Sequence, residues 1–222
     1  MRVRLTVALL LCALAVCQVW GQKMERFVKG GLTIALFDGT AASDEDVGHT
    51  GFNIGAGVRL PLNSKRTTFL EPAVEFISKG NVYDVSKAGG RVTFSLWYIE
   101  AQVDFIYRWQ IGEHWRIPFG TGLYGAYGIG SKITATNGIT WFRGIPVSES
   151  LSMFDSAVGA NRWDAGLRVW TVGVEYDRFM FRWDFELGFF SQFHNRLPYG
   201  LEEGKDYHGG NWATSLNLGY CF

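Results

Sequence analysis

Ten charged residues recur at alternate positions within segments that otherwise alternate between apolar and small or polar residues. They are Arg59, Glu71, Glu75, Glu100, Asp104, Arg108, Glu175, Arg182, Asp184 and Glu186. Carboxylates grouped with guanidinium ions can form ion pairs, offer a path to cations or hold a proton. Because buried charges must be paired or hydrated, the chemistry depends on the elements that enclose them.

A glycine motif offers a second candidate chemistry. The segment Gly120-Thr-Gly122-Leu-Tyr-Gly125 has the glycine spacing of a dinucleotide-binding loop. That loop requires a strand to end and a helix to begin at the glycines. Here the alternation continues to Gly130, so we predict an uninterrupted strand, no nucleotide site and no cofactor.

Histidines near the C-terminus provide a third candidate. His194 and His208 share residues 192–210 with several acids, but their spacing matches no common metal motif. Ser191 with His194, or Asp206 with His208, has the residue types of a hydrolase or acyltransferase. No third group completes either pair in the sequence pattern. We therefore predict no metal site and no enzymatic activity.

Eight segments alternate with a period near two, as expected for β-strands with one apolar face. They are residues 27–37, 50–60, 67–79, 91–109, 114–130, 163–177, 179–189 and a last segment ending with 216–222. Pro72 lacks a ladder donor and predicts a bulge or local break. Arg168 interrupts the apolar side of the sixth segment, which predicts a position at a membrane interface.

The last segment places four large residues, Leu216, Leu218, Tyr220 and Phe222, on one face. An apolar face without a soluble core must face lipid, where only a closed barrel satisfies the hydrogen bonds of strands. Short connections at 61–66, 110–113 and 177–178 alternate with long ones at 38–49, 80–90, 131–162 and 192–210. We predict an all-β fold: an eight-stranded antiparallel up-and-down transmembrane β-barrel in the bacterial outer membrane, with both termini periplasmic.

The N-terminus has the pattern of a secretory signal peptide. Arg2 and Arg4 precede an apolar run over residues 5–16, and Gly21 ends a small-residue cleavage site. A lipoprotein signal at Cys17 is the alternative. Cleavage after Gly21 would leave a barrel domain at 22–222 with 19 of the 21 basic groups against 21 acids. This balance does not indicate nucleic-acid binding, and Cys221 would be the only thiol left.

An eight-stranded barrel is about wide enough to be filled by its own side chains. The ten charged residues are therefore expected to line the lumen, with seven acids against three arginines. One interpretation is an ion-pair network that fills and rigidifies the barrel. The alternative is a narrow acidic path for cations or a proton-linked site.

The predicted connection 131–162 is unusually apolar. Its large residues include Trp141, Phe142, Leu151, Met153 and Phe154. Such a density of apolar side chains in a loop indicates that they cover something. The loop could plug the mouth of the barrel or bind a partner protein, and the sequence does not separate these alternatives.

Several segments resemble the outer-membrane β-barrel proteins of Bacteroidota, the porin family or PorT-like proteins. They are Leu70-Glu-Pro-Ala-Val-Glu-Phe-Ile-Ser-Lys-Gly80, Tyr98-Ile-Glu-Ala-Gln-Val, Gly120-Thr-Gly-Leu-Tyr-Gly-Ala-Tyr, Val172-Gly-Val-Glu-Tyr176 and the terminal Phe222. The resemblance implies a structural or interaction barrel, an accessory component of an envelope assembly such as the type IX secretion and gliding machinery. Expected partners are outer-membrane lipid, envelope proteins and the insertion machinery, whose C-terminal signal the last strand resembles. A narrow channel or hydrophobic-molecule transporter, and an outer-leaflet lipid-modifying enzyme, are the alternatives.

Overall fold

The computed structural model describes residues 24–37, 46–85, 89–142, 145–147, 152–154, 160–190 and 210–222. The predicted signal peptide at 1–21 lies outside these residues. So do Leu151 and the loop candidates Ser191, His194, Asp206 and His208. The side chains of Trp141 and Phe142 also fall outside the described part of the chain.

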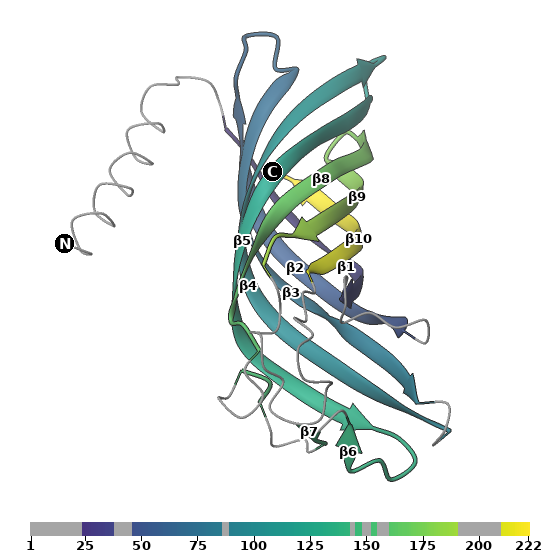
Figure 1. Ribbon diagram of the computed structural model, residues 1–222. Helices are drawn as coiled ribbons and strands as arrows, with labels where there is room; N and C mark the ends of the chain where they lie inside the picture. The colour runs from purple at the N-terminus through teal and green to yellow at the C-terminus, as the bar shows by residue number, and fades with distance from the viewer. Residues whose placement is uncertain are drawn as a thin grey trace, which may run out of the picture.

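Eight long strands close into an antiparallel barrel (Figure 1). They are β1 (Glu25–Phe37), β2 (Asp46–Pro61), β3 (Thr68–Val85), β4 (Gly90–Ile111), β5 (Trp115–Ala135), β8 (Trp163–Tyr176), β9 (Phe179–Gly188) and β10 (Asn211–Cys221). Each pairs with the next in that order, and β10 pairs back with β1 from Phe27↔Cys221 to Phe37↔Asn211. The predicted eight-stranded up-and-down barrel is confirmed.

Two further strands, β6 (Trp141–Phe142) and β7 (Ile145–Pro146), form a small hairpin separate from the barrel sheet. The described residues include no helix that is long and apolar enough to cross a bilayer.

Alternation along each strand sorts side chains between the inside and the outside of the barrel. In β10, Leu216 and Leu218 are 51% and 70% exposed on the outside, whereas Asn217 is buried inside. Phe222 follows the same outward face, and the inward Cys221 is buried. The period of two read from the sequence therefore corresponds to a real separation of the two faces.

β3 and β5 continue beyond the predicted segments 67–79 and 114–130, whereas β4 matches the predicted 91–109 closely. The expected long connection at 80–90 is only residues 86–89, because β3 continues to Val85 and β4 begins at Gly90. β5 likewise continues to Ala135, and the three strands project beyond the rest of the barrel at the end opposite the short turns (Figure 1). We call this part, residues 78–85 of β3, 90–98 of β4 and 128–135 of β5, the extension.

The prediction included the β4 part of the extension but missed most of its β3 and β5 parts, because the apolar face is inverted there. In β4, Val92, Phe94 and Leu96 point inward and are at most 3% exposed. Further along the same strand, Ile99 and Val103 point outward and are 41% and 45% exposed. The strand does not change direction; the apolar residues move from even to odd positions. The same change occurs in β3 between the outward Val74, 56% exposed, and the inward Tyr83, 4% exposed, so the search for one apolar face ended at Lys79 in that strand.

Pro72 does not produce the predicted bulge. The pairs Gly57↔Ala73 and Leu60↔Leu70 flank it at the same register between β2 and β3. On its other side Pro72 pairs with Val103 of β4 in an unbroken register. Only the ladder toward β2 is interrupted locally, which a single missing donor explains.

Candidate functional site

All ten charged residues singled out from the sequence point into the lumen, and none is more than 8% exposed. The most exposed of them is Arg108, which lies near the short-turn mouth. Its Nη1 is 3.0 Å from Oε2 of Glu25, the first residue of β1. The lumen is therefore lined by charge along most of its length.

The cluster nearest the short turns is built on two arginines. Arg59 of β2 binds Glu71 of β3 through Nε at 2.6 Å and Glu175 of β8 through Nη2 at 2.5 Å. Arg182 of β9 donates to both carboxylate oxygens of Glu71, at 2.7 and 3.0 Å. The ring of Phe27 lies 5.6 and 5.7 Å from the two guanidinium carbons. These contacts join strands from opposite sides of the barrel.

Arg168 lies buried in the lumen. The predicted position at a membrane interface is therefore wrong. A bulge in β8 between Arg168 and Trp170 shifts its register against β9. Because one extra residue is inserted, Arg168 and Thr171 both point inward, with 1% and 0% exposure, although they are three positions apart. Strict alternation from Trp170 had placed Arg168 on the outer face.

The guanidinium of Arg168 faces carboxylates from three strands. Its nitrogens lie 2.5 Å from Glu186, 3.3 Å from Asp184, 3.4 Å from Glu100, 3.5 Å from Asp104 and 4.0 Å from Glu75. The side-chain oxygen of Gln102 also accepts a hydrogen bond from it. One buried cation is thus shared by five carboxylates in the most acidic section of the barrel.

Two lysines and one aspartate complete the network. Lys29 of β1 lies 2.8 Å from Glu75 and 3.2 Å from Asp184. Lys79 of β3 lies 2.9 Å from Glu100, 3.0 Å from Glu186 and 3.8 Å from Asp164. Sequence analysis did not select them, although Lys79 shares the inward parity of Glu71 and Glu75, which was the available signal.

With these residues the charges are closer to balance than the sequence indicated. Among the described lumen residues that are buried, eight are carboxylates and six are lysines or arginines. The eight are Glu71, Glu75, Glu100, Asp104, Asp164, Glu175, Asp184 and Glu186, and the six are Lys29, Arg59, Lys79, Arg108, Arg168 and Arg182. Each of the six cations has a carboxylate oxygen within 4.0 Å. The geometry is that of an ion-pair network spanning the lumen.

An apolar cluster lies inside the barrel on the side of the extension. Met153 and Phe154, 0% and 8% exposed, pack with inward side chains of β3, β4 and β5. The Phe154 ring meets Tyr98 edge-on at 6.1 Å between centroids. Met153 N–H donates to Ser131 Oγ at 2.8 Å, which fixes the segment against β5. We call residues 152–154 the cap.

β5 leaves space for the cap at Gly128, which has no side chain. A Cβ at this position would overlap the Phe154 ring. At the lower border of the cluster, Lys79 Nζ lies 4.2 Å from the Tyr124 ring centroid, so the charge network begins where the apolar cluster ends. Of the five loop residues predicted to plug the mouth or bind a partner, Met153 and Phe154 therefore lie inside the mouth.

Replacing Phe154 by alanine should lower the free energy of unfolding by about 2–4 kcal/mol, because a buried ring is lost and a cavity remains. F154L keeps most of the apolar volume and should cost less than about 1.5 kcal/mol. Urea unfolding of the refolded barrel in detergent, followed by tryptophan fluorescence, measures both. A loss in F154A no larger than that in F154L would show that the cap does not pack in the mouth.

Of the other candidate chemistries, only the glycine motif lies within the described residues; Ser191, His194, Asp206 and His208 do not. The glycine motif lies within β5, which pairs with β4 and β8 along Gly120–Gly125 and continues as a strand to Ala135. No group of three or more histidine, cysteine, aspartate or glutamate side chains in this part of the chain is arranged to hold a metal ion.

No family model and no curated protein sequence matches the chain. Among solved structures, it is similar to Neisserial surface protein A at 13% identity and a TM-score of 0.49, covering 90% of this chain and 100% of that one. The attachment invasion locus protein Ail of Yersinia pestis, in complex with a heparin analogue, matches at 14% identity over 90% and 100% of the chains, with a TM-score of 0.42. The translocator domain of the autotransporter NalP from Neisseria meningitidis matches at 9% identity and a TM-score of 0.26, covering 100% of this chain and 96% of that one. With likeness this low, the barrel is established by its own strand pairing.

Proposed function

We propose that this chain is an integral outer-membrane β-barrel with a closed lumen and a structural or interaction role in the cell envelope. The inversion of the apolar face along β3, β4 and β5 carries this proposal. Apolar residues face outward over the height of a bilayer and inward beyond it. In a soluble barrel, the outward apolar residues would be exposed to water, which is unfavourable.

The outward apolar belt has the height that a membrane requires. On β5 it runs from Trp115, 50% exposed, to Tyr127, 40% exposed, with Phe119 and Leu123 between them. At the usual strand rise this segment is about 40 Å long, or about 30 Å along the axis of a barrel with ordinary strand tilt. The hydrocarbon core of a bilayer is also about 30 Å thick.

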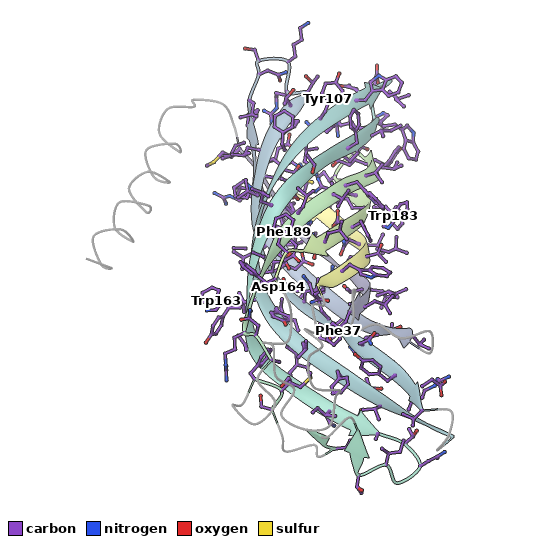
Figure 2. The ribbon with its side chains drawn as sticks, in the orientation of Figure 1. Phe37, Tyr107, Trp163, Asp164, Trp183 and Phe189 are labelled. Carbon is purple, nitrogen blue, oxygen red and sulfur yellow. The ribbon has the colours of Figure 1, made fainter. Side chains whose placement is uncertain are left out.

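Aromatic residues mark both edges of the belt. Trp115 and Tyr176 pack together near the short turns, with ring centroids 4.8 Å apart. Tyr127 and Trp163 pack at 4.9 Å near the start of the extension. Figure 2 shows Tyr107 toward the short-turn end and Trp163 nearer the middle of the molecule. Two such girdles are typical of outer-membrane barrels.

In the extension the apolar residues lie on the inner face and polar residues on the outer face, the reverse of the belt, as expected for a part of the barrel that lies in water. Its inner face holds the apolar cluster with the cap, whereas beyond Trp97 and the exposed Ile129 its outer face in β4 carries Arg91, Thr93 and Ser95. In outer-membrane barrels the long connections lie outside the cell and the short turns lie in the periplasm. By this rule we place the extension at the cell surface, and the start of β1 and the end of β10 in the periplasm. An exposed platform of this kind favours interaction with other envelope components. The resemblance to PorT-like proteins extends the proposal to an accessory component of an assembly such as the type IX machinery.

The filled lumen favours a structural barrel over a channel. Ions would have to displace a paired network and then an apolar cluster sealed by Met153 and Phe154. We expect the purified protein to migrate in a heat-modifiable way on gels, as folded outer-membrane barrels do, and to give little or no stepwise current in planar bilayers. Regular current steps from folded protein would favour the channel alternative. A failure to insert into lipid vesicles would contradict the membrane assignment itself.

A further inference from the structure

A pocket at the short-turn end takes no part in the lumen network. Its volume is about 560 Å³ and it is lined by Arg116, Tyr176, Asp177, Arg178, Phe179 and Tyr220. The walls come from β5, from the turn that joins β8 to β9, and from β10. Phe179, 65% exposed, belongs to the outward apolar belt. The pocket therefore lies at the periplasmic edge of the proposed membrane-spanning surface.

The pocket is held in shape from both sides. Asp177 N–H donates to the His114 carbonyl oxygen at 3.0 Å, and Cys221 N–H donates to the Arg178 carbonyl oxygen at 2.8 Å. Asp177 has a φ of 50°, a left-handed conformation that aspartate tolerates better than most residues. The turn is thus fixed to its neighbours, and the lining side chains start from a defined backbone.

The two arginines of the pocket, unlike those of the lumen, are not paired with carboxylates of the described residues. Neither Arg116 nor Arg178 has a carboxylate within 4.0 Å among the described residues. Arg116 Nη1 donates to the backbone oxygen of Asp177 at 3.0 Å, and Arg178 Nη1 lies 3.4 Å from the Tyr220 hydroxyl. The Asp177 carboxylate is engaged elsewhere, 2.7 Å from His114 Nδ1. Within the part of the chain that the structure describes, two guanidinium groups therefore have no carboxylate partner and lie beside the aromatic side chains of the pocket.

We propose that this pocket binds the phosphodiester headgroup of an anionic phospholipid in the periplasmic leaflet. Guanidinium groups match the geometry of phosphate oxygens, and basic pockets at a membrane edge bind anionic headgroups. Tyr176, Phe179 and Tyr220 would contact the glycerol and the first acyl carbons. The inference rests on the membrane location proposed above. The shared chemistry is a phosphate anion, so the test must separate a lipid from free phosphate.

The test is a titration of the folded protein in zwitterionic micelles, followed by NMR of the arginine side chains. The probes are short-chain phosphatidylglycerol, short-chain phosphatidylcholine and inorganic phosphate. We expect phosphatidylglycerol to shift the Arg116 and Arg178 signals and to bind at least about tenfold more tightly than phosphatidylcholine or inorganic phosphate. The double variant R116Q/R178Q should lose about tenfold or more of this affinity. K65Q removes an exposed charge from the β2–β3 turn outside the pocket and should bind as the wild type does.

Three outcomes would overturn the proposal. Equal binding of phosphatidylglycerol and phosphatidylcholine would remove the role of the charge. Equally tight binding of inorganic phosphate would make the site one for a free anion. Unchanged affinity in R116Q/R178Q would place the lipid elsewhere. Heat-modifiable migration checks that the double variant folds, and R178Q alone serves if it does not. If the protein inserts into vesicles but fails these tests, the lipid-binding proposal for the pocket is contradicted and the membrane location is not.

Discussion

R168M is expected to lower the free energy of unfolding by about 3–5 kcal/mol or to prevent folding. Methionine fills much of the space but removes a cation that lies within 4.0 Å of five carboxylates, Glu186, Asp184, Glu100, Asp104 and Glu75. Lys29 and Lys79 remain beside four of them, whereas Asp104 keeps no other cation within 4.0 Å among the described residues. Breaking a buried ion pair from one side leaves the partner charge without compensation, which costs more than the pair contributes when intact. Here several carboxylates lose the same partner at once.

The pH dependence of R168M distinguishes this electrostatic cause from a packing defect. Without Arg168, the described lumen keeps eight buried carboxylates and five buried cations. Lowering the pH adds protons to carboxylates and relieves the excess negative charge. The stability difference between R168M and the wild type should therefore be largest at and above neutral pH and should shrink as the pH falls.

Urea unfolding in detergent at several pH values measures this difference. R168K keeps the charge but loses the planar fork of the guanidinium, so it should fall between the wild type and R168M. R91M is the control, because Arg91 is largely exposed and forms a 3.4 Å surface pair with Asp84. It should change stability by less than about 0.5 kcal/mol. A deficit in R168M that does not vary with pH would show that charge is not its cause.

Arg168 also shows why the lumen could be predicted only in part. Where a strand keeps strict alternation, as in β9, the inward Arg182, Asp184 and Glu186 can be read directly from the sequence. A bulge reverses that assignment for every residue beyond it, and no residue type marks the bulge in β8. Arg168 was therefore assigned to the wrong face, although Thr171 and Glu175 on the other side of the bulge were placed correctly.

The extension illustrates a second limit. Outward apolar residues identify a strand in lipid, and inward ones identify a strand in water. β4 contains both, since Phe94 points into the apolar cluster and Phe105 points outward. The predicted segment 91–109 covers both parts of β4, but in β3 and β5 the search for one outward apolar face stopped at residues 79 and 130, before the inward apolar residues of the extension. The cap residues Met153 and Phe154 were noticed for their apolar character, yet only the structure places them in the mouth.

G31A is expected to destabilise the barrel by about 3 kcal/mol or more and to remove most of the folded form. Gly31 of β1 pairs with Asn217 of β10 at the seam where the barrel closes. A Cβ at Gly31 would overlap the backbone oxygen of Leu216, which cannot move without displacing β10. The strand that ends at Cys221 can therefore approach β1 this closely only if no side chain lies between them.

G125A is the matched control for this substitution. Gly125 also lies in a barrel strand, and a Cβ there meets no atom within 4 Å. Neither glycine has a positive φ, so alanine strains the backbone at neither position. Each variant adds one methyl group to a strand, at Gly31 against the backbone of β10 and at the exposed Gly125 into open space, and the difference in their heat-modifiable fractions and urea midpoints reports the cost of the overlap at Gly31. Equal stability of G31A and G125A would mean that β1 and β10 are less closely apposed than the register from Phe27↔Cys221 to Phe37↔Asn211 requires.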